Sequence, residues 1–398
     1  MQINNQYKSI LLKRGKEESL KRFHPWIFSG AIARIDDGIQ DGDLVNVFTH
    51  DHQFIAVGHY QRGSITVRVL SFKPEVIDNE FFVKRLTSAF NMRMAIGVAN
   101  RLNNNTYRLV HGEGDNLPGL VIDCYDTTAV MQAHSIGMHM MRHEIAKALL
   151  QVEGLNITSV YYKSENTLSY RDNLEQEDEF LIGYSSNNIA LENGLKFHID
   201  WLKGQKTGFF VDQRDNRALL EQYAKGKNVL NMFCYTGGFS VYAMRGGANL
   251  VHSVDSSAKA IELTNENVEM NFPGDTRHEA FCEDAFKYLD EHDDKYDLII
   301  LDPPAFAKHR SALHNALKGY TRLNLKGFQR IKRGGILFTF SCSQAVNKDQ
   351  FRSAVFTAAA QAKRKVRILH QLHQPADHPI NIYHPEGEYL KGLVLYVE

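Results

Sequence analysis

Four chemically active side chains each stand at the end of an apolar, strand-like stretch in the C-terminal half of the chain. They are Asp255 at the end of VHSVD, Asp284 at the end of HEAFCED, Asp302 at the end of YDLIILD and Cys342 at the end of FTFSC. Parallel strands carry such groups to one edge of their sheet, and open α/β sheets bind their ligands at that edge. The spacing therefore predicts one crevice lined by three carboxylates and a thiol.

Cys342 could serve as a nucleophile at this edge if its thiolate form is favoured. Carbon 5 of a pyrimidine reacts poorly until a nucleophile has added at carbon 6, so a thiol beside a methyl donor would have a clear purpose. The alternative is a buried bystander, because cysteine is commonly a core residue. The four cysteines are Cys124, Cys234, Cys282 and Cys342. They form no CxxC pair, so no zinc or iron–sulfur site is expected.

The segment VLNMFCYTGGFS, residues 229–240, joins an apolar strand to a helix through Gly237 and Gly238. Glycine lets a ligand approach the backbone closely, although a plain strand–helix turn is the alternative. Asp255 follows about one strand later, where a carboxylate can accept hydrogen bonds from ribose hydroxyls. A dinucleotide dehydrogenase would share that acidic residue but would also show G-x-G-x-x-G, which this chain lacks.

Asp302 is followed by two prolines in LIILDPPAF. Successive prolines make a stiff, extended ledge that can hold a flat base. We expect the base to contact Pro303, Pro304 and Phe306, while Asp302 hydrogen-bonds to or protonates a ring nitrogen. Asp284, taken alone, is as well explained as the N-cap of a helix.

These residues need a sheet to bring them together, and the segment 226–398 has the required pattern of strands alternating with helices. That alternation predicts βαβ units and a doubly wound parallel sheet. Residues 8–72 instead read as short strands separated by turns, which is typical of a small β-barrel. We expect three domains, over residues 1–74, 75–190 and 191–398, with the middle one α+β.

The charge of the chain balances, with 46 Lys and Arg against 46 Asp and Glu, which argues against a protein that coats nucleic acid indiscriminately. Residues 1–35 nevertheless hold seven basic and two acidic residues. A solvated face is the default interpretation, and a phosphate-contacting patch that includes Lys13 and Arg14 is the alternative. No window is apolar enough for a membrane span, and no secretory signal is visible, so we expect a cytoplasmic protein.

Several motifs together resemble the RlmI-type ribosomal RNA large-subunit 5-methylcytosine methyltransferases. They are HPWIFSGAI (24–32), GQKTGFFVDQRDNR (204–217), VLNMFCYTGGFS, DPPAFAK, FTFSCS, PADHP (375–379) and HPEGEYLKG (384–392). The resemblance covers essentially the whole chain. It implies an N-terminal PUA domain that binds RNA, a small central domain, and a Rossmann-like class I methyltransferase domain that uses S-adenosylmethionine.

The resemblance also implies roles for individual residues. Cys342 matches the family's nucleophile and Asp302 its acidic motif. The cofactor site maps onto Phe233, Tyr235, Gly237, Gly238, Asp255, Ser256, Asp284 and Asp302, bordered by Gln213 and Arg214. Many other RNA 5-methylcytosine enzymes carry a second cysteine after the motif-four proline, whereas this chain reads DPPAF there.

The expected function is therefore methylation of carbon 5 of a cytosine in large-subunit ribosomal RNA through a covalent cysteine adduct. Two alternatives stay open. Methylation of a guanine or adenine nitrogen would suit the same ledge and needs no cysteine, and a non-catalytic RNA-binding ribosome-assembly factor could keep the fold as a scaffold. Ribosomal RNA is the expected partner, with a homodimer as a further possibility and no membrane partner.

Overall fold

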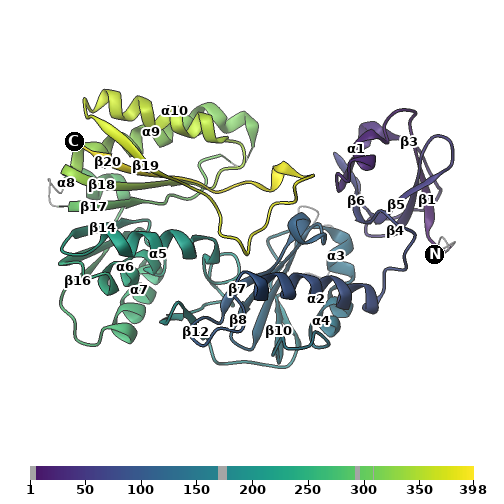
Figure 1. The fold of residues 1–398 in the computed structure, drawn as a ribbon, viewed down its shortest axis with the longest axis horizontal. Helices are drawn as coiled ribbons and strands as arrows, with labels where there is room; N and C mark the ends of the chain where they lie inside the picture. Colours follow the sequence, from purple (N-terminus) through teal and green to yellow (C-terminus); the bar gives the residue numbers. More distant parts are fainter. Residues whose placement is uncertain (1–5, 169–176, 292–295, 308) are drawn as a thin grey trace. The chain divides into compact units, whose positions relative to one another are not determined.

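The computed structural model describes residues 6–168, 177–291, 296–307 and 309–398. The chain forms two compact units (Figure 1). The first comprises residues 1–191, 199–211 and 376–387, and the second comprises residues 192–198, 212–375 and 388–398. The three predicted domain boundaries stay a prediction, but the contacts group 199–211 and 376–387 with the first unit, which the sequence did not suggest.

The N-terminal sheet of the first unit has the strand order β2-β6-β5-β4-β1-β3. Its pairs are antiparallel, except that β1 runs parallel to β4. The elements are β1 (Lys8–Leu12), α1 (Glu18–Lys21), β2 (Trp26–Phe28), β3 (Ile32–Ile35), β4 (Leu44–Phe48), β5 (Phe54–Tyr60) and β6 (Ile65–Ser71). Alternate residues such as Val45 and Val47 are fully buried in a small core with Ile10 and Val67. This sheet confirms the small β-domain predicted near the N-terminus.

A second sheet of the first unit has the order β11-β10-β9-β8-β7. Its elements are α2 (Asn79–Ala95), β7 (Thr106–His111), β8 (Leu120–Tyr125), β9 (Thr128–Ala133), α3 (Ile136–Met140), α4 (Arg142–Leu149), β10 (Ser159–Tyr162) and β11 (Glu179–Ile182). Helix α2 begins where the Asp78 side chain accepts a hydrogen bond from the N–H of Phe81. It then buries Phe82, Leu86 and Phe90 in the core at helical spacing.

The segment 376–387 belongs to this first unit through Asp377, which is wholly buried. Its Oδ2 accepts the backbone N–H of Arg108 at 3.0 Å, and its carbonyl oxygen accepts Nη2 of Arg93 at 2.7 Å. The Arg93 guanidinium also pairs with Asp115. A segment from late in the chain is therefore fixed into the first unit by buried hydrogen bonds.

The second unit is built on a seven-stranded sheet in the order β16-β15-β14-β17-β18-β20-β19. The strands are β14 (Asn228–Met232), β15 (Leu250–Asp255), β16 (His278–Cys282), β17 (Tyr296–Leu301), β18 (Ile331–Ser341), β19 (Val366–Leu372) and β20 (Lys391–Val397). The first five run parallel, whereas β20 pairs antiparallel with both β18 and β19. A separate small sheet pairs β12 (Ile189–Glu192) with β13 (Leu195–His198).

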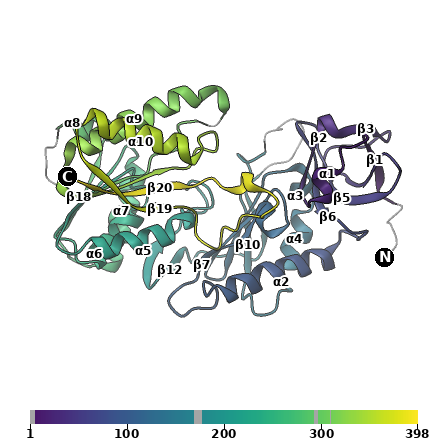
Figure 2. The same cartoon turned by 45° about the horizontal axis from the view of Figure 1, so that its top comes forward.

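Helices cover both faces of the seven-stranded sheet. They are α5 (Arg214–Tyr223), α6 (Gly238–Arg245), α7 (Ala258–Asn271), α8 (Ala285–Glu291), α9 (Leu313–Arg330) and α10 (Lys348–Gln361). Figures 1 and 2 show α5, α6 and α7 on one face and α9 and α10 on the other. The doubly wound sheet is the fold predicted for this part of the chain. Strand order reverses beside β14, and in such sheets ligands bind at the carboxyl ends of the strands near that reversal.

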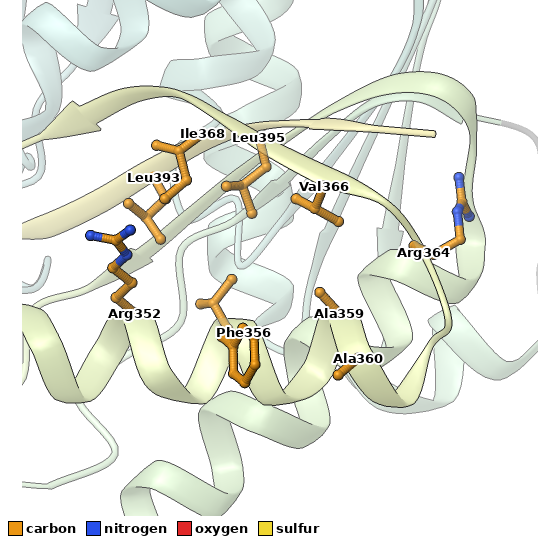
Figure 3. A pocket seen from close by; sticks show the side chains of 10 residues that line it. Arg352, Phe356, Ala359, Ala360, Arg364, Val366, Ile368, Leu393 and Leu395 are labelled. Atoms are coloured by element: carbon orange, nitrogen blue, oxygen red, sulfur yellow. The ribbon is translucent and has the colours of Figure 1, made fainter.

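A groove of about 350 Å³ lies between α10 and the antiparallel strands β19 and β20. Figure 3 shows Val366, Leu393 and Leu395 on the strands above Phe356 of the helix. These lining residues differ from the predicted site residues. In the part of the chain that the structure describes, no helix is both long and apolar enough to cross a bilayer.

Candidate active site

Most of the predicted site residues lie at or beside the carboxyl edge of the seven-stranded sheet, whereas Lys13 and Arg14 lie in the first unit. Met232 at the end of β14 pairs with Leu301 at the end of β17, and Leu301 pairs with Thr339 near the end of β18. Asp302 directly follows β17, and Cys342 directly follows β18. Because these neighbouring strands are parallel and in register, the structure brings Asp302 and Cys342 to the same edge.

The loop after β14 has an unusual backbone. Phe233 and Tyr235 have φ of 59° and 49°, and Gly237 has φ of 74°. Positive φ is costly for residues other than glycine, so the surrounding structure must hold this loop in place. Helix α7 supplies part of that support, because Oγ1 of Thr264 donates to the carbonyl oxygen of Tyr235 at 2.9 Å and Nδ2 of Asn267 donates to that of Thr236 at 2.8 Å.

Gly237 is required at its position for two reasons. Its φ of 74° suits glycine, and a Cβ there would lie 2.7 Å from Cγ2 of Thr264. Gly237 is the N-cap of α6, so the first N–H groups of that helix lie at the sheet edge. A tight glycine loop that opens a helix fits a nucleoside-containing cofactor held close to the backbone.

Asp255 ends β15 as predicted, and its carboxylate already holds the loops around it. Oδ2 accepts the N–H of Tyr235 at 3.0 Å, and Oδ1 accepts the N–H of Ser257 at 2.9 Å. A carboxylate oxygen has two lone pairs, so each can also accept a ligand hydroxyl. Ser256 is exposed beside it, and its carbonyl oxygen accepts the Cys282 thiol at 3.6 Å.

Asp284 is a helix cap in this structure. Strand β16 ends at Cys282, two residues earlier than the sequence pattern suggested. Oδ1 of Asp284 accepts the N–H groups of Phe286 and Lys287, both at 3.0 Å, at the start of α8. The capping alternative is therefore the role that the contacts show, while a contact to the cofactor stays a prediction.

Gln213 and Asp302 contact each other directly. Nε2 of Gln213 donates to Oδ2 of Asp302 at 2.9 Å, and its Oε1 accepts Nδ2 of Asn216 at 2.6 Å. Gln213 is 3% exposed, so both ends of its amide are fixed and Asp302 is held as an acceptor. The adjacent Arg214 is equally buried and lies 3.4 Å from Asp215.

The proline ledge differs in part from the prediction. Pro304 is exposed and Phe306 is half-buried, but Pro303 is buried. The ring of Phe306 packs against that of Tyr320 on α9, with centroids 4.7 Å apart. Pro303 therefore shapes the turn from inside and offers no surface to a base, because its ring is covered by protein.

Cys342 is half-buried, and the residue after it fixes its position. Oγ of Ser343 accepts the N–H of Ala307 at 3.3 Å and shares a hydrogen bond of 2.9 Å with the hydroxyl of Tyr320. Ser343 is wholly buried. These bonds link the end of β18 to the loop after Asp302 and to α9, so the thiol is carried on a rigid segment.

Lys391 is part of this edge and was not predicted. It opens β20 opposite Ser341, and it is 5% exposed. Its Nζ donates to the carbonyl oxygens of Ser343 at 2.6 Å and Tyr389 at 2.7 Å. Burial lowers the pKa of Lys391 to about 8, against the opposing influence of the Cys342 thiolate. The signals in the sequence were the motif HPEGEYLKG (384–392), whose lysine was not singled out, and the apolar stretch KGLVLYV that this lysine begins.

A buried ion pair beneath the glycine loop was also missed. The Arg217 guanidinium donates to both carboxylate oxygens of Glu192, at 2.8 and 2.7 Å. The Tyr242 hydroxyl donates to the same carboxylate at 3.0 Å. A Cβ on Gly238 would lie 3.0 Å from Cδ of Arg217, so this arginine packs directly under the loop. The signal in the sequence was the DQRDNR segment, whose last arginine was not singled out.

Lys13 and Arg14 follow β1 in the first unit, and both are exposed. Nζ of Lys13 donates to the carbonyl oxygen of Gly30 at 3.1 Å. Exposed lysine and arginine can contact phosphates, and a role of these two in RNA binding stays a prediction.

Two family models match the chain. Residues 10–72 match a PUA-like domain, and residues 108–383 match an S-adenosylmethionine-dependent methyltransferase. The second match spans strands β14 to β19 of the sheet, the glycine loop, Asp302 and Cys342. S-adenosylmethionine is therefore the cofactor of this chain, in agreement with the prediction.

Curated relatives are similar over nearly their whole length. The ribosomal RNA large subunit methyltransferase I of Aeromonas hydrophila is 40% identical over 395 residues, which cover 97% of this chain and 98% of that protein. The protein of the same name from Tolumonas auensis is 41% identical, with the same coverage.

Solved structures of methyltransferases have a similar fold over nearly the whole chain. A Streptococcus mutans protein described as a SAM-dependent methyltransferase is 25% identical with a TM-score of 0.83, and the match covers 98% of this chain and 100% of that chain. A methyltransferase structure in complex with SAH matches with a TM-score of 0.84, at the same identity and coverage. The chain therefore belongs to the S-adenosylmethionine-dependent methyltransferases, and within them to the family of ribosomal RNA large subunit methyltransferase I proteins.

Proposed function

We propose that this chain methylates carbon 5 of a cytosine in large-subunit ribosomal RNA, with Cys342 as the nucleophile. The carrying observation is the position of Cys342, half-buried at the carboxyl edge of the sheet and one strand away from Asp302. The names of the relatives support ribosomal RNA of the large subunit as the substrate.

In the proposed reaction the Cys342 thiolate adds to carbon 6 of the base, which makes carbon 5 nucleophilic. Asp302, whose Oδ2 accepts a hydrogen bond from Gln213, would act in its protonated form: its other oxygen would donate a proton to the ring nitrogen and so stabilise the negative charge that develops there. S-adenosylmethionine, when bound, supplies an electrophilic methyl group to carbon 5. A base then removes the proton from carbon 5, and the bond between Sγ and carbon 6 breaks to release the product.

The proposed cofactor contacts follow the geometry of the edge. The loop residues Phe233, Tyr235, Gly237 and Gly238 would lie against the cofactor, while Asp255, Ser256 and Asp284 would contact its nucleoside. Gln213, Arg214 and Asp302 would border the methyl group. Pro304 and Phe306 would contact the base, which must first be turned out of its stack.

The RNA is proposed to bind the PUA-like domain as well, with Lys13 and Arg14 contacting phosphates. Such contacts carry no sequence information, so they would position the RNA and leave the choice of base to the crevice.

The test is methyl transfer from labelled S-adenosylmethionine to large-subunit ribosomal RNA by the Cys342→Ala variant. We expect at least a thousandfold loss of rate, because carbon 6 then lacks its nucleophile, whereas the matched variant Cys282→Ala should keep its rate. RNA containing 5-fluorocytidine should form a denaturation-resistant adduct with the unsubstituted protein and none with Cys342→Ala. Methylation that survives Cys342→Ala, with product on a purine nitrogen, would instead establish nitrogen methylation. Failure of the unsubstituted protein to bind S-adenosylmethionine would favour a non-catalytic assembly factor.

A further inference from the structure

We propose that Lys391 is a positioning residue that holds Cys342 in its thiolate form. This inference rests on the proposed function, in which Cys342 is the nucleophile. Thiolate, not thiol, adds to carbon 6, and its fraction at neutral pH depends on nearby charge.

The strand pairing places Lys391 beside the cysteine. Lys391 pairs with Ser341 across β18 and β20, and Ser341 directly precedes Cys342. The Lys391 Nζ lies 2.6 Å from the carbonyl oxygen of Ser343, which directly follows Cys342. The amine is thus anchored to the residue on one side of Cys342 and its own backbone is paired with the residue on the other.

The hydrogen bonds of Lys391 leave room for one more acceptor. An ammonium group has three N–H donors, and the carbonyl oxygens of Ser343 and Tyr389 accept two of them. Carbonyl oxygens carry no net charge, so they do not neutralise a buried ammonium. A thiolate at Cys342 would accept the third N–H and would also neutralise the charge of the ammonium. Burial of a cation is costly unless an anion compensates its charge.

The other charged groups that act on Lys391 oppose each other. Glu388 raises the pKa of Lys391 and Lys348 lowers it, and these two side chains form an ion pair with one another. The Tyr320 hydroxyl shares a hydrogen bond with Oγ of Ser343, and burial raises the pKa of Tyr320, so this hydroxyl stays neutral near pH 7. Cys342 is therefore the anion best placed to balance the ammonium.

The chemistry of this step is a simple ionisation. The thiol proton of Cys342 passes to solvent, Lys391 keeps its own proton, and no bond to Lys391 forms or breaks. Because burial lowers the pKa of Lys391 to about 8, most of its amine is still in the ammonium form at neutral pH, and this cation is lost as the pH rises past 8.

The experiment measures the ionisation of Cys342 from the pH dependence of its alkylation by iodoacetamide, followed by peptide mass spectrometry. The background variant Cys282→Ser removes the exposed thiol. Burial raises the pKa values of Cys124 and Cys234 to about 12, so these two thiols react little near neutral pH.

We expect Cys342 to ionise at least one pH unit below an ordinary thiol, whose pKa is about 8.5. Lys391→Met keeps the aliphatic length but removes the charge, and it should slow alkylation at pH 7 about tenfold. Lys391→Arg should restore the rate to within about threefold of that of Lys391, because the cation returns. Lys259→Met is the matched control, since it removes an exposed lysine that pairs with Glu262, and it should leave the rate unchanged.

Two results would overturn the proposal: a Cys342 that ionises at pH 8.5 or above in the Cys282→Ser background, or equal alkylation rates with methionine and lysine at position 391. The first measurement needs no substitution at Lys391, so it can overturn the proposal even if Lys391→Met does not fold. Alkylation uses neither RNA nor cofactor, so its outcome is independent of the methyl-transfer test with Cys342→Ala. A low Cys342 pKa together with methylation that survives Cys342→Ala would refute the proposed function while leaving the ion pair standing.

Discussion

At the scale of single residues, Gly237 stands where any side chain would collide with its neighbour. Gly237 has a φ of 74°, and a Cβ added there would lie 2.7 Å from Cγ2 of Thr264. Gly247, in contrast, has a similar φ of 83°, but its nearest neighbour, Cγ of Lys225, would lie at an ordinary 3.7 Å from an added Cβ. A substitution at Gly247 therefore introduces backbone strain alone, whereas one at Gly237 introduces backbone strain and a steric collision.

We expect Gly237→Ala to weaken S-adenosylmethionine binding at least tenfold, measured by calorimetry, because the loop must move away from Thr264. Gly247→Ala should cost a similar backbone strain of about 1 kcal/mol in the free energy of unfolding, yet leave cofactor affinity unchanged. Equal affinities for both variants would contradict the assignment of this loop to the cofactor.

The buried pair of Arg217 and Glu192 makes a second prediction at this scale. Glu192→Ala leaves a guanidinium that is 3% exposed without its carboxylate, and we expect a loss of about 3 to 5 kcal/mol in the free energy of unfolding. The control is Glu262→Ala, which breaks an exposed pair with Lys259 and should cost less than about 1 kcal/mol. Chemical denaturation measures both, and a small effect of Glu192→Ala would show that Arg217 finds another partner.

At the scale of elements, the strands of the second unit explain why much of the site could be predicted. YDLIILD and FTFSC are apolar stretches followed by a reactive residue, and parallel pairing of β17 with β18 brings their ends together. Lys391 could not be found in this way, because its proximity to Cys342 depends on the antiparallel register of β20. Glu192 was missed for a similar reason, since its partner lies 25 residues further along the chain. For Asp284 the position after a strand did not distinguish between two roles, because a carboxylate there can contact a ligand or cap the next helix.

At the scale of the whole molecule, buried histidines link stability to pH. His59 on β5 is 1% exposed, and burial, with help from the charge of Arg68, lowers its pKa to about 4. An unfolded chain protonates this histidine near pH 6.5, whereas the folded chain keeps it neutral down to about pH 4. Between these pH values the unfolded state binds one more proton than the folded state. The free energy of unfolding is therefore unaffected by His59 above pH 6.5 and decreases as the pH falls toward 4.

We expect thermal and urea unfolding of the protein to show this loss, with up to about 3 kcal/mol from His59 alone between pH 6.5 and 4. His59→Gln cannot take up the proton and should reduce the pH dependence by up to one proton, whatever its stability at pH 7. Identical pH dependence with histidine and glutamine would show that His59 is protonated in the folded state as readily as in the unfolded one.

The buried position of Asp377 bears on how the polypeptide matures as it leaves the ribosome. Domains generally fold in the order in which they are synthesised. Here Arg93 and Arg108 emerge more than 260 residues before the aspartate to which both are bonded. A nascent chain that has not reached that aspartate lacks both hydrogen bonds, each of which contributes about 0.5 to 1.5 kcal/mol to stability. The first unit therefore gains its full stability only when translation of the second is nearly finished, so a prematurely terminated product would be destabilised near its beginning as well as at its end.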